Sequence, residues 1–349
     1  MFNCISSDIG GTNSRFFLHS VCPDSSKAEL LFTKIYSSDK HDSLEGVLGE
    51  FLKEKEVGEK SPKYLTLSIA GTPKDNVIRK FANLPWPEVS GEKLEKEFGF
   101  EKVFILNDFE VIGHAIPKLK TESLVYLQKG KGPVEENYLV IGSGTGLGMT
   151  FVTKIGAKFR AVNSEGGHIF IGATNDLEKE YEQFILEQYK ITEPSRKEFF
   201  AEAEDLSSGS GLPLLYDFVH LKLEGKLPEK ELSGKQVNEK FGKGKLGEEC
   251  LKLFMRFLGR ICNATAKVFL VRGGRLILVG NFAKVLESGF EGKLEDFWKM
   301  MLPSFVCDPY FEEIFSKLDI GILTSNHSEL AVDGCLHYLK QEIGIEHKE

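Results

Sequence analysis

A glycine-rich stretch in the middle of the chain has the composition of a phosphate-binding turn. It reads Gly142-Ser-Gly-Thr-Gly-Leu-Gly148, with glycine at every second position. Without side chains at these positions, backbone N–H groups are open to a ligand, and the hydroxyls of Ser143 and Thr145 add donors. It is not a dinucleotide-binding fingerprint, because Leu147 stands where that motif has glycine, nor a Walker A loop, because no Gly-Lys-Ser/Thr follows. The alternative is a glycine-rich hairpin without a ligand.

A second turn, near the start of the chain, combines glycines with an acid. In Asp8-Ile-Gly-Gly-Thr-Asn13 the acid ends a strand pattern, and two glycines and a hydroxyl follow. The carboxylate of Asp8 can hold Mg²⁺ through water against nucleotide phosphates, because Mg²⁺ prefers one or two carboxylates plus phosphate oxygens. The alternative is a capped turn. Because each turn opens one half of the chain, we interpret the two turns as a pair.

The elements around the first turn predict an α/β fold. Apolar and β-branched runs indicate strands, and amphipathic patterns between them indicate helices. Strands alternating with helices form a parallel or mixed sheet packed on both faces. The expected strands are Ile5–Ile9, Arg15–His19, Leu30–Tyr36, Tyr64–Ala70 and Lys102–Asn107, and the expected helices are Ser43–Glu56 and Ser90–Phe98.

The pattern begins again after a loop predicted at Gln128–Asn137, which is rich in glycine and charge. Strand Tyr138–Ile141, the glycine turn and strand Met149–Lys154 repeat the first hairpin, which predicts a duplicated architecture. The charged block Leu223–Gly247 is interpreted as a solvated surface. The remaining expected elements are helices Asp176–Tyr189, Leu212–Leu223, Leu246–Val271, Phe282–Glu287 and Glu329–Ile343, with one late strand, Leu276–Gly280.

Composition excludes several classes of protein. A length of 349 residues suits two lobes or one large domain. The net charge of −8 argues against nucleic acid as the main partner. No apolar run approaches the roughly 18 residues that span a bilayer, and the first residues lack the features of a signal peptide. We therefore expect no membrane partner and a cytoplasmic location. The 6 cysteines form no CxxC pair, which favours reduced thiols over disulfides or a zinc site.

Four motifs, in this order along the chain, resemble those of the bacterial-type glucokinases, a family within the hexokinase/actin/heat-shock ATPase superfamily. They are Asp8-Ile-Gly-Gly-Thr-Asn13, Leu106-Asn-Asp-Phe109, Gly142–Gly148 and Glu165-Gly-Gly-His168. Weaker similarities are Asn83-Leu-Pro-Trp86, Glu204 with Leu206–Leu212, and Gly274–Gly280. The resemblance implies an α/β, two-lobed ribonuclease H-like or actin-like ATPase fold with a cleft between the lobes. It places residues 1–117 and 334–349 in a small lobe and residues 118–333 in a large lobe.

The resemblance also implies an activity and a set of site residues. The activity is ATP-dependent phosphorylation of D-glucose at its 6-hydroxyl, with Mg²⁺ and in a homodimer. Asp108 would be the catalytic base. The residues expected to bind the sugar are Asn83, Asn107, Asp108, Glu165, His168 and Glu204. Those expected to bind Mg·ATP are Asp8, Gly10, Gly11, Thr12, Asn13, Gly142, Gly144, Thr145, Gly146 and Gly280, with Asp8 on the metal.

Physical chemistry supports several of these roles. Sugar hydroxyls are both donors and acceptors, which suits carboxylate and amide side chains. Asp108 follows a strand and begins the helical pattern Phe109–Ile116, whose positive end would keep it ionised. The alternative for Asp108 is a helix N-cap. Phosphoryl transfer needs in-line alignment, neutralised phosphates, a base near the accepting oxygen and exclusion of water.

The chain departs from the family pattern where the base and ribose are expected. It has Gly280-Asn281 in place of a Gly-Gly pair, and the segment from Asn326 to Gly334 is poorer in glycine than usual. Two other functions stay open. One is a kinase of another hexose or an amino sugar. The other is a non-catalytic sugar-sensing regulator, against which we note the lack of a segment before Ile5 for a DNA-binding motif and of clustered zinc cysteines.

Overall fold

The chain forms two compact units in a computed structural model that describes residues 1–23, 28–119, 121–131, 135–192, 200–324 and 327–345. The first unit comprises residues 1–119, 154–163 and 325–349, and the second comprises residues 120–153 and 164–324. Both contain a β-sheet with helices, which confirms the predicted α/β class. The division implied by the resemblance, a small lobe of residues 1–117 and 334–349 and a large lobe of residues 118–333, stays a prediction.

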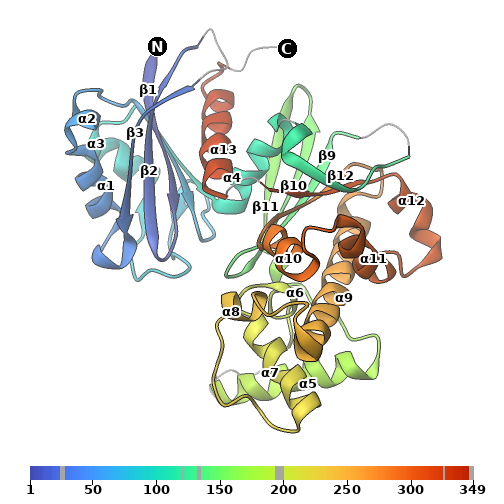
Figure 1. Ribbon diagram of the computed structural model, residues 1–349. Helices are drawn as coiled ribbons and strands as arrows, with labels where there is room; N and C mark the ends of the chain where they lie inside the picture. Colours follow the sequence, from blue (N-terminus) through green and yellow to red (C-terminus); the bar gives the residue numbers. More distant parts are fainter. Residues whose placement is uncertain (24–27, 120, 132–134, 193–199, 325–326, 346–349) are drawn as a thin grey trace. The chain divides into compact units, whose positions relative to one another are not determined.

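In the described part of the chain, the first unit is built on a five-stranded sheet (Figure 1). Strands β1 and β2 form an antiparallel hairpin that β3 extends, while β4 and β7 follow β1 in parallel. All five were predicted. In sheet order they are β3 (Ala28–Ser37), β2 (Asn13–Val21), β1 (Phe2–Ile9), β4 (Tyr64–Ile69) and β7 (Lys102–Asn107).

Helices cover this sheet, and their ends follow local sequence rules. Serine caps start α1 (Leu44–Leu52) and α3 (Gly91–Phe98), where Ser43 and Ser90 accept backbone N–H groups of the first turn. Gly99 ends α3 with a left-handed conformation, φ 78°. The short helix α2 (Lys55–Gly58) follows α1, and strands β5 (Val77–Ile78) and β6 (Val89–Ser90) form a separate small pair.

The late helix α13 (His327–Glu342), where a helix was predicted over Glu329–Ile343, packs on the first unit. Leu336 and Leu339 share a buried cluster with Cys4 of β1, and Ala331 shares another with Val111 of α4 (Asp108–Ala115). A Cβ at Gly334 would lie 1.9 Å from the carbonyl oxygen of Val111, so only glycine permits this close helix contact. Figure 1 shows α13 beside α4 and β1.

A six-stranded sheet in the described residues has the same plan as the first, and five of its strands lie wholly or mostly in the second unit, whereas residues 158–163 of one edge strand are grouped with the first unit. Strands β9 and β10 form an antiparallel hairpin beside β11, and β12 and β13 follow β9 in parallel. This agreement confirms the predicted duplication. In order the strands are β11 (Lys158–Ser164), β10 (Leu147–Ile155), β9 (Asn137–Ser143), β12 (Arg275–Gly280), β13 (Asp319–Leu323) and β8 (Leu124–Gln128).

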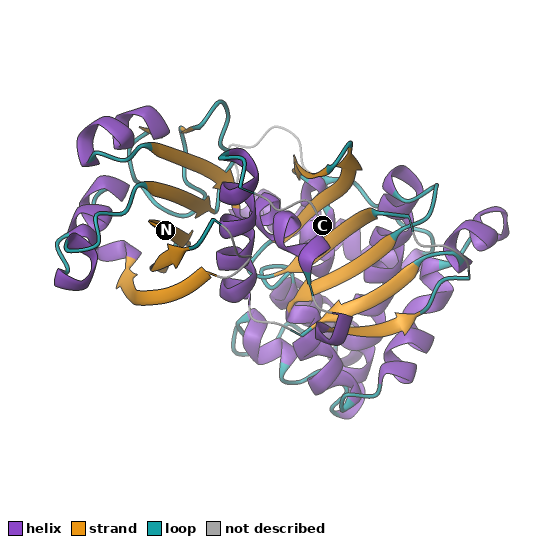
Figure 2. Ribbon diagram, turned by 90° about the horizontal axis from the view of Figure 1, so that it is seen from above, coloured by secondary structure: helices purple, strands orange, loops and turns teal. Residues whose placement is uncertain are grey.

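The core of the second unit forms between this sheet and the long helix α9 (Gly244–Phe269). Apolar side chains of α9, among them Phe254 and Leu258, are buried with Leu139 of β9 and Leu276 of β12. Figure 2 shows helices packed along one face of the larger sheet. The other helices are α5 (Asp176–Thr192), α6 (Ala203–Ser207), α7 (Leu212–Glu224), α8 (Gly234–Asn238), α10 (Asn281–Phe290), α11 (Leu294–Phe305) and α12 (Glu312–Ser316).

Two sequence interpretations need qualification. The block Leu223–Gly247 is not only a solvated surface, because Val237 and Phe241 are fully buried in the core of the second unit. The loop predicted at Gln128–Asn137 lies between β8 and β9, and its residues 132–134 are outside the described residues, as is Asn326.

Candidate active site

The Asp8 turn is a hairpin between β1 and β2. The backbone N–H of Gly10 donates to the carbonyl of Asn13 at 2.9 Å and closes the turn. Ser38 holds the turn from outside, because its hydroxyl donates to Gly10 O at 2.8 Å and its N–H donates to Thr12 O at 2.9 Å. The predicted residues Gly10 to Asn13 are therefore fixed in one conformation by a serine that sequence reasoning missed.

Asp8 is buried, with 7% of its surface exposed. Its oxygen Oδ2 accepts hydrogen bonds from Arg15 Nη1 at 3.0 Å and from Ser328 Oγ at 2.9 Å. Arg15 faces Asp8 across the hairpin, since the two residues are register partners. Because both donors bind Oδ2, neither engages Oδ1, and the carboxylate is held in a fixed orientation.

Asn83, a predicted sugar-binding residue, lies against the Asp8 turn. A Cβ at Gly11 would come within 2.6 Å of the Cβ of Asn83. Any side chain at Gly11 would displace Asn83 or the turn, so the second glycine of the motif is required by packing inside the first unit. The structure thus brings one predicted sugar residue to the predicted nucleotide turn.

Asn107, rather than Asp108, caps helix α4. Asn107 Oδ1 accepts the backbone N–H groups of Phe109 and Glu110 at 2.9 and 3.2 Å, and its Nδ2 donates to Gly71 O at 2.8 Å. The N-cap alternative for Asp108 is therefore wrong. Asp108 is the first residue of the helix, half-buried, and its Oδ1 accepts the N–H of Phe109 at 3.0 Å.

The Asp8 turn and Asp108 lie at the same edge of the sheet. Strands β1, β4 and β7 are parallel, and Ile9, Ile69 and Asn107 occupy one line of the register. With strands spaced about 4.8 Å apart, Asn107 lies roughly 10 Å from Ile9. Ligands of open α/β sheets bind beyond such carboxyl ends. The structure therefore gathers the predicted residues of the first unit at one edge.

The second glycine turn connects β9 and β10. Gly144 N–H donates to Gly146 O at 2.9 Å, and Leu147 N–H donates to Glu204 Oε2 at 2.8 Å. A Cβ at Gly144 would meet nothing within 4 Å, whereas one at Gly146 would lie 2.5 Å from Glu204 Oε2. Gly144 thus faces open space, and Gly146 is packed against Glu204, which is predicted to bind the sugar.

Two further segments hold this turn in place. Gly209 N–H and Asn281 Nδ2 both donate to Gly144 O, at 3.0 and 3.2 Å. Gly280, the predicted nucleotide-binding residue before Asn281, has φ 77°, and a Cβ there would lie 2.5 Å from Ser143 O. Asn281, which stands where the family has the second glycine of a Gly-Gly pair, therefore connects α10 to the glycine turn through its side chain. Lys284 Nζ donates in turn to Asn281 Oδ1 at 3.1 Å.

Glu165 and His168 lie on one tight turn beside β10. A Cβ at Gly167 would lie 1.9 Å from Leu147 O, so this turn packs directly on the glycine turn. His168 Nε2 is 3.8 Å from Glu165 Oε2. Its Nδ1 is 2.5 Å from an oxygen of Glu202, a residue that sequence reasoning missed, and this hydrogen bond raises the pKa of His168.

The structure thus collects the predicted residues into two groups. In the first unit are Asp8, Gly10, Gly11, Thr12, Asn13, Asn83, Asn107 and Asp108. In the second unit are Gly142, Gly144, Thr145, Gly146, Glu165, His168, Glu204 and Gly280. A further acid in the first turn of α4 is Glu110, and burial raises its pKa to about 7.

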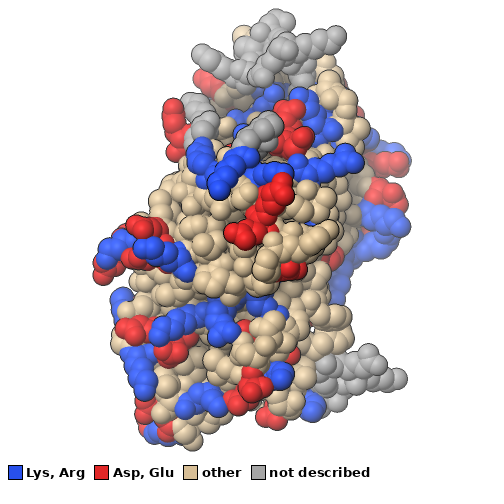
Figure 3. Space-filling view, turned by 90° about the vertical axis from the view of Figure 1, so that its right-hand side faces the viewer, with Lys and Arg blue, Asp and Glu red and all other residues tan. Residues whose placement is uncertain are grey.

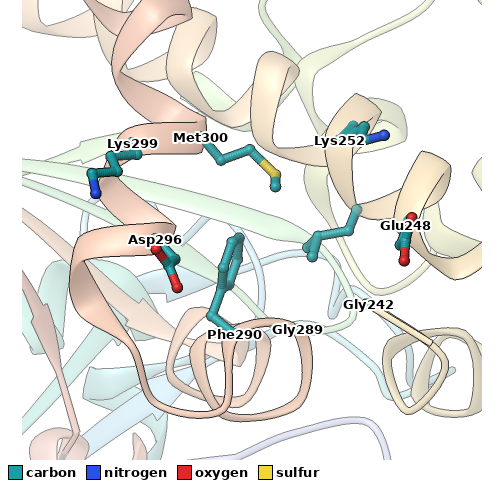
Figure 4. Close-up of a pocket in the computed structure, with 9 residues that line it drawn as sticks. Gly242, Glu248, Lys252, Gly289, Phe290, Asp296, Lys299 and Met300 are labelled. Carbon is teal, nitrogen blue, oxygen red and sulfur yellow. The ribbon is translucent and has the colours of Figure 1, made fainter. Parts of the chain in front are cut away.

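A pocket of about 520 Å³ elsewhere in the second unit contains none of the predicted residues. Figure 4 shows the side chains of Lys252 and Glu248 at one side of it, Lys299 and Asp296 at the other, and Phe290 between them. Figure 3 shows Lys and Arg mixed with Asp and Glu over the visible face. Within the described residues, no helix has the length and apolar character needed to cross a membrane.

Comparisons with known proteins identify the family of this chain. The family model described as Glucokinase matches residues 5–339. A glucokinase of an Enterobacter species is 32% identical over 313 residues, covering 86% of this chain and 89% of that protein. A glucokinase of Cronobacter sakazakii is 29% identical over 347 residues, with 97% of each chain covered. The crystal structure of a glucokinase from an Antarctic psychrotroph shares the fold, with a TM-score of 0.74, 22% identity and 98% and 99% of the two chains covered. The chain therefore belongs to the Glucokinase family.

Proposed function

We propose that this protein is an ATP-dependent glucokinase that transfers the terminal phosphoryl group of ATP to the 6-hydroxyl of D-glucose. The observation that carries the proposal is the placement of Asp108. Asp108 begins the helix that Asn107 caps. It lies at the carboxyl ends of the parallel strands β1, β4 and β7, where the Asp8 turn also lies. A family match over residues 5–339 supports the same activity.

Asp108 is proposed to take the proton of the 6-hydroxyl as that oxygen attacks phosphorus. A carboxylate at the first turn of a helix is stabilised in its ionised form by the helix dipole. Ionised Asp108 accepts the hydroxyl proton and orients the attacking oxygen, which is the main task of a base in phosphoryl transfer. Asn107 is proposed to act on the sugar while its side chain also holds the helix start.

The other sugar hydroxyls are proposed to bind Asn83, Glu165, His168 and Glu204. Carboxylates accept hydroxyl protons, and a histidine N–H donates to a hydroxyl oxygen. The pairing of Glu165 with His168 offers an acceptor and a donor 3.8 Å apart, a spacing that suits two neighbouring hydroxyl groups of a hexose. Recognition of several hydroxyls at once favours a sugar over a simple alcohol.

The nucleotide is proposed to bind the two glycine turns. In the second, Gly144 leaves room for a phosphate oxygen to approach the backbone. In the first, Asp8 fits Mg²⁺ because its carboxylate is fixed through Oδ2 and one such group, with phosphate oxygens and water, satisfies this ion. Bound Mg²⁺ would neutralise charge on the phosphates. The cytoplasmic location and the homodimer belong to the same proposal, and light scattering tests the latter.

A coupled assay of ADP release with ATP and a panel of hexoses tests the proposal. We expect the highest kcat/KM with D-glucose, and a lower value with D-mannose, D-fructose and N-acetyl-D-glucosamine. A higher kcat/KM with another sugar would make the protein a kinase of that sugar. Binding of glucose in calorimetry, with no ADP formed from ATP in the presence of any of the sugars, would favour the sugar-sensing regulator.

A further inference from the structure

Glu202 approaches His168 from a different segment of the second unit. The imidazole Nδ1 and the carboxylate Oε2 are 2.5 Å apart. The side chain of Glu202 is 20% exposed, while that of His168 is 49% exposed. A carboxylate that is mostly buried thus contacts the inner nitrogen of a histidine whose ring reaches solvent, an arrangement that fixes the ring orientation.

The position of Glu202 is set by backbone contacts. Ala203 N–H donates to Ile169 O at 2.9 Å, and Phe170 and Glu202 form an isolated antiparallel bridge. The rings of Phe170 and Phe200 meet edge-on, 4.3 Å between centroids, and extend this contact. The N–H of Glu202 also donates to Asp205 Oδ2 at 2.8 Å. Two chain segments are therefore joined directly beside His168, and the approach of Glu202 follows from their pairing.

We propose that Glu202 is a positioning residue for the sugar site, which holds the ring of His168 so that Nε2 and Glu165 together face the sugar hydroxyls. The inference rests on the proposed function, because it assigns the ligand of Nε2. With the Nδ1 proton directed to Glu202, the ring can present only Nε2 to a ligand. Rotation of the ring would break a charge-assisted hydrogen bond, the stronger kind in proteins.

The charges around His168 favour its protonated form. Glu202, Glu204 and Glu165 all act to raise its pKa, with the hydrogen bond from Glu202 the largest cause. Protonated His168 carries N–H groups on both nitrogens, so Nδ1 donates to Glu202 while Nε2 donates to a sugar oxygen. Glucose affinity should therefore be highest below the pKa of His168 and decline as the pH rises through it.

Steady-state kinetics of two variants test the role of Glu202. Glu202→Ala should raise the KM for glucose about tenfold, the scale of one charge-assisted hydrogen bond, with the KM for ATP unchanged. Glu202→Gln should raise it less, because its amide oxygen can still accept the Nδ1 proton. The matched control is Glu313→Gln, which removes an exposed carboxylate paired with Lys317 and should change neither KM. Equal increases in both KM values would overturn the proposal.

An NMR titration of His168 separates this inference from the proposed function. The pKa of His168 should fall in Glu202→Gln, since the variant lacks the charge, and the decline of glucose affinity should begin at lower pH. An unchanged titration of His168 would overturn the inference even in an active glucokinase. If no hexose is phosphorylated, the proposed function fails, while the titration still reports whether Glu202 controls His168.

Discussion

Glu204 Oε2 accepts the backbone N–H of Leu147 at 2.8 Å. A residue predicted to bind the sugar therefore contacts the glycine turn that is predicted to bind phosphate. Glu204 lies two residues after Glu202, which contacts His168. One short segment of the second unit therefore contacts both the glycine turn and the sugar turn. The two contacts come from residues two positions apart, so this segment joins the glycine turn to the turn that carries His168.

Two substitutions of Glu204 should separate its effects. Glu204→Gln keeps an acceptor for Leu147 N–H, so the KM for ATP should stay near its value while the KM for glucose rises. Glu204→Ala also loses the acceptor, and both KM values should rise, by about tenfold for a hydrogen bond of roughly 1–1.5 kcal/mol. Initial rates with each substrate varied in turn give both constants. Identical profiles for the two variants would contradict the link between Glu204 and the glycine turn.

Replacement of the proposed base should abolish most turnover without loss of glucose binding. Asp108→Asn keeps an oxygen acceptor but cannot take the hydroxyl proton, so kcat should fall by about 10²–10⁴. Glucose binding is measured by calorimetry, and kcat by ADP release. Asp176→Asn is the matched control, because it neutralises an exposed aspartate that pairs with Lys179 in the second unit and should leave kcat unchanged. Turnover near that of the parent in a folded Asp108→Asn protein would remove Asp108 from the mechanism.

A side chain at Gly144 should impair ATP binding selectively. Its Cβ would meet nothing within 4 Å, and Gly144 is not among the residues with positive φ, so Gly144→Val is compatible with the fold. The valine would occupy the space in which the phosphates are proposed to bind. We expect a higher KM for ATP and an unchanged Kd for glucose. Gly172→Val is a matched control, since a Cβ there also meets nothing within 4 Å. Equal effects of the two variants on ATP would refute the assignment.

Loss of the Asn281 side chain should loosen the glycine turn. Asn281→Gly removes the hydrogen bond to Gly144 O, and Gly144 then keeps the bond from Gly209. The KM for ATP should rise severalfold, consistent with one neutral hydrogen bond of roughly 1 kcal/mol, and the KM for glucose should not change. Lys284→Met, which leaves Asn281 in place, serves as the comparison. A lower KM for ATP in Asn281→Gly would show that the side chain obstructs the nucleotide.

Glu110 should make stability depend on pH. Its pKa is raised to about 7 by burial, so its neutral form favours the folded state. This contribution is fully present below the ordinary pKa of glutamate and is lost as the pH rises through about 7. Glu110→Gln removes the ionisation, so the variant should gain up to about 3 kcal/mol relative to the parent between pH 5 and pH 8. Urea unfolding at both pH values measures the difference, and a constant difference would show that Glu110 ionises freely.

Much of the fold followed from local patterns, because both hairpins combine apolar strands with glycine turns. Strand β13, residues Asp319–Leu323, was missed because it is buried throughout and has no alternation of polar and apolar residues. Helix α11 was missed as well, and it contains Pro303, which breaks the usual helical pattern. Such segments depend on tertiary packing for their structure.

The site residues divide in the same way. Motif residues such as Asp8 and Asp108 could be proposed from the sequence because the residues of each motif follow one another in the chain. Arg15 could have been found from the hairpin register, since it faces Asp8 across β1 and β2. Ser328 and Glu202 could not, because they approach Asp8 and His168 from 320 and 34 residues away. Contacts of that separation have no local signal in a single sequence.

The packing of α13 has a consequence for synthesis on the ribosome. The strands of the first unit leave the ribosome early, yet the surface formed by Cys4 of β1 and Val111 of α4 is covered by residues 331–339. Everything in the second unit is translated in between. The nascent first unit must therefore wait with an exposed apolar face until nearly the whole chain has been made, which is the state that chaperones recognise.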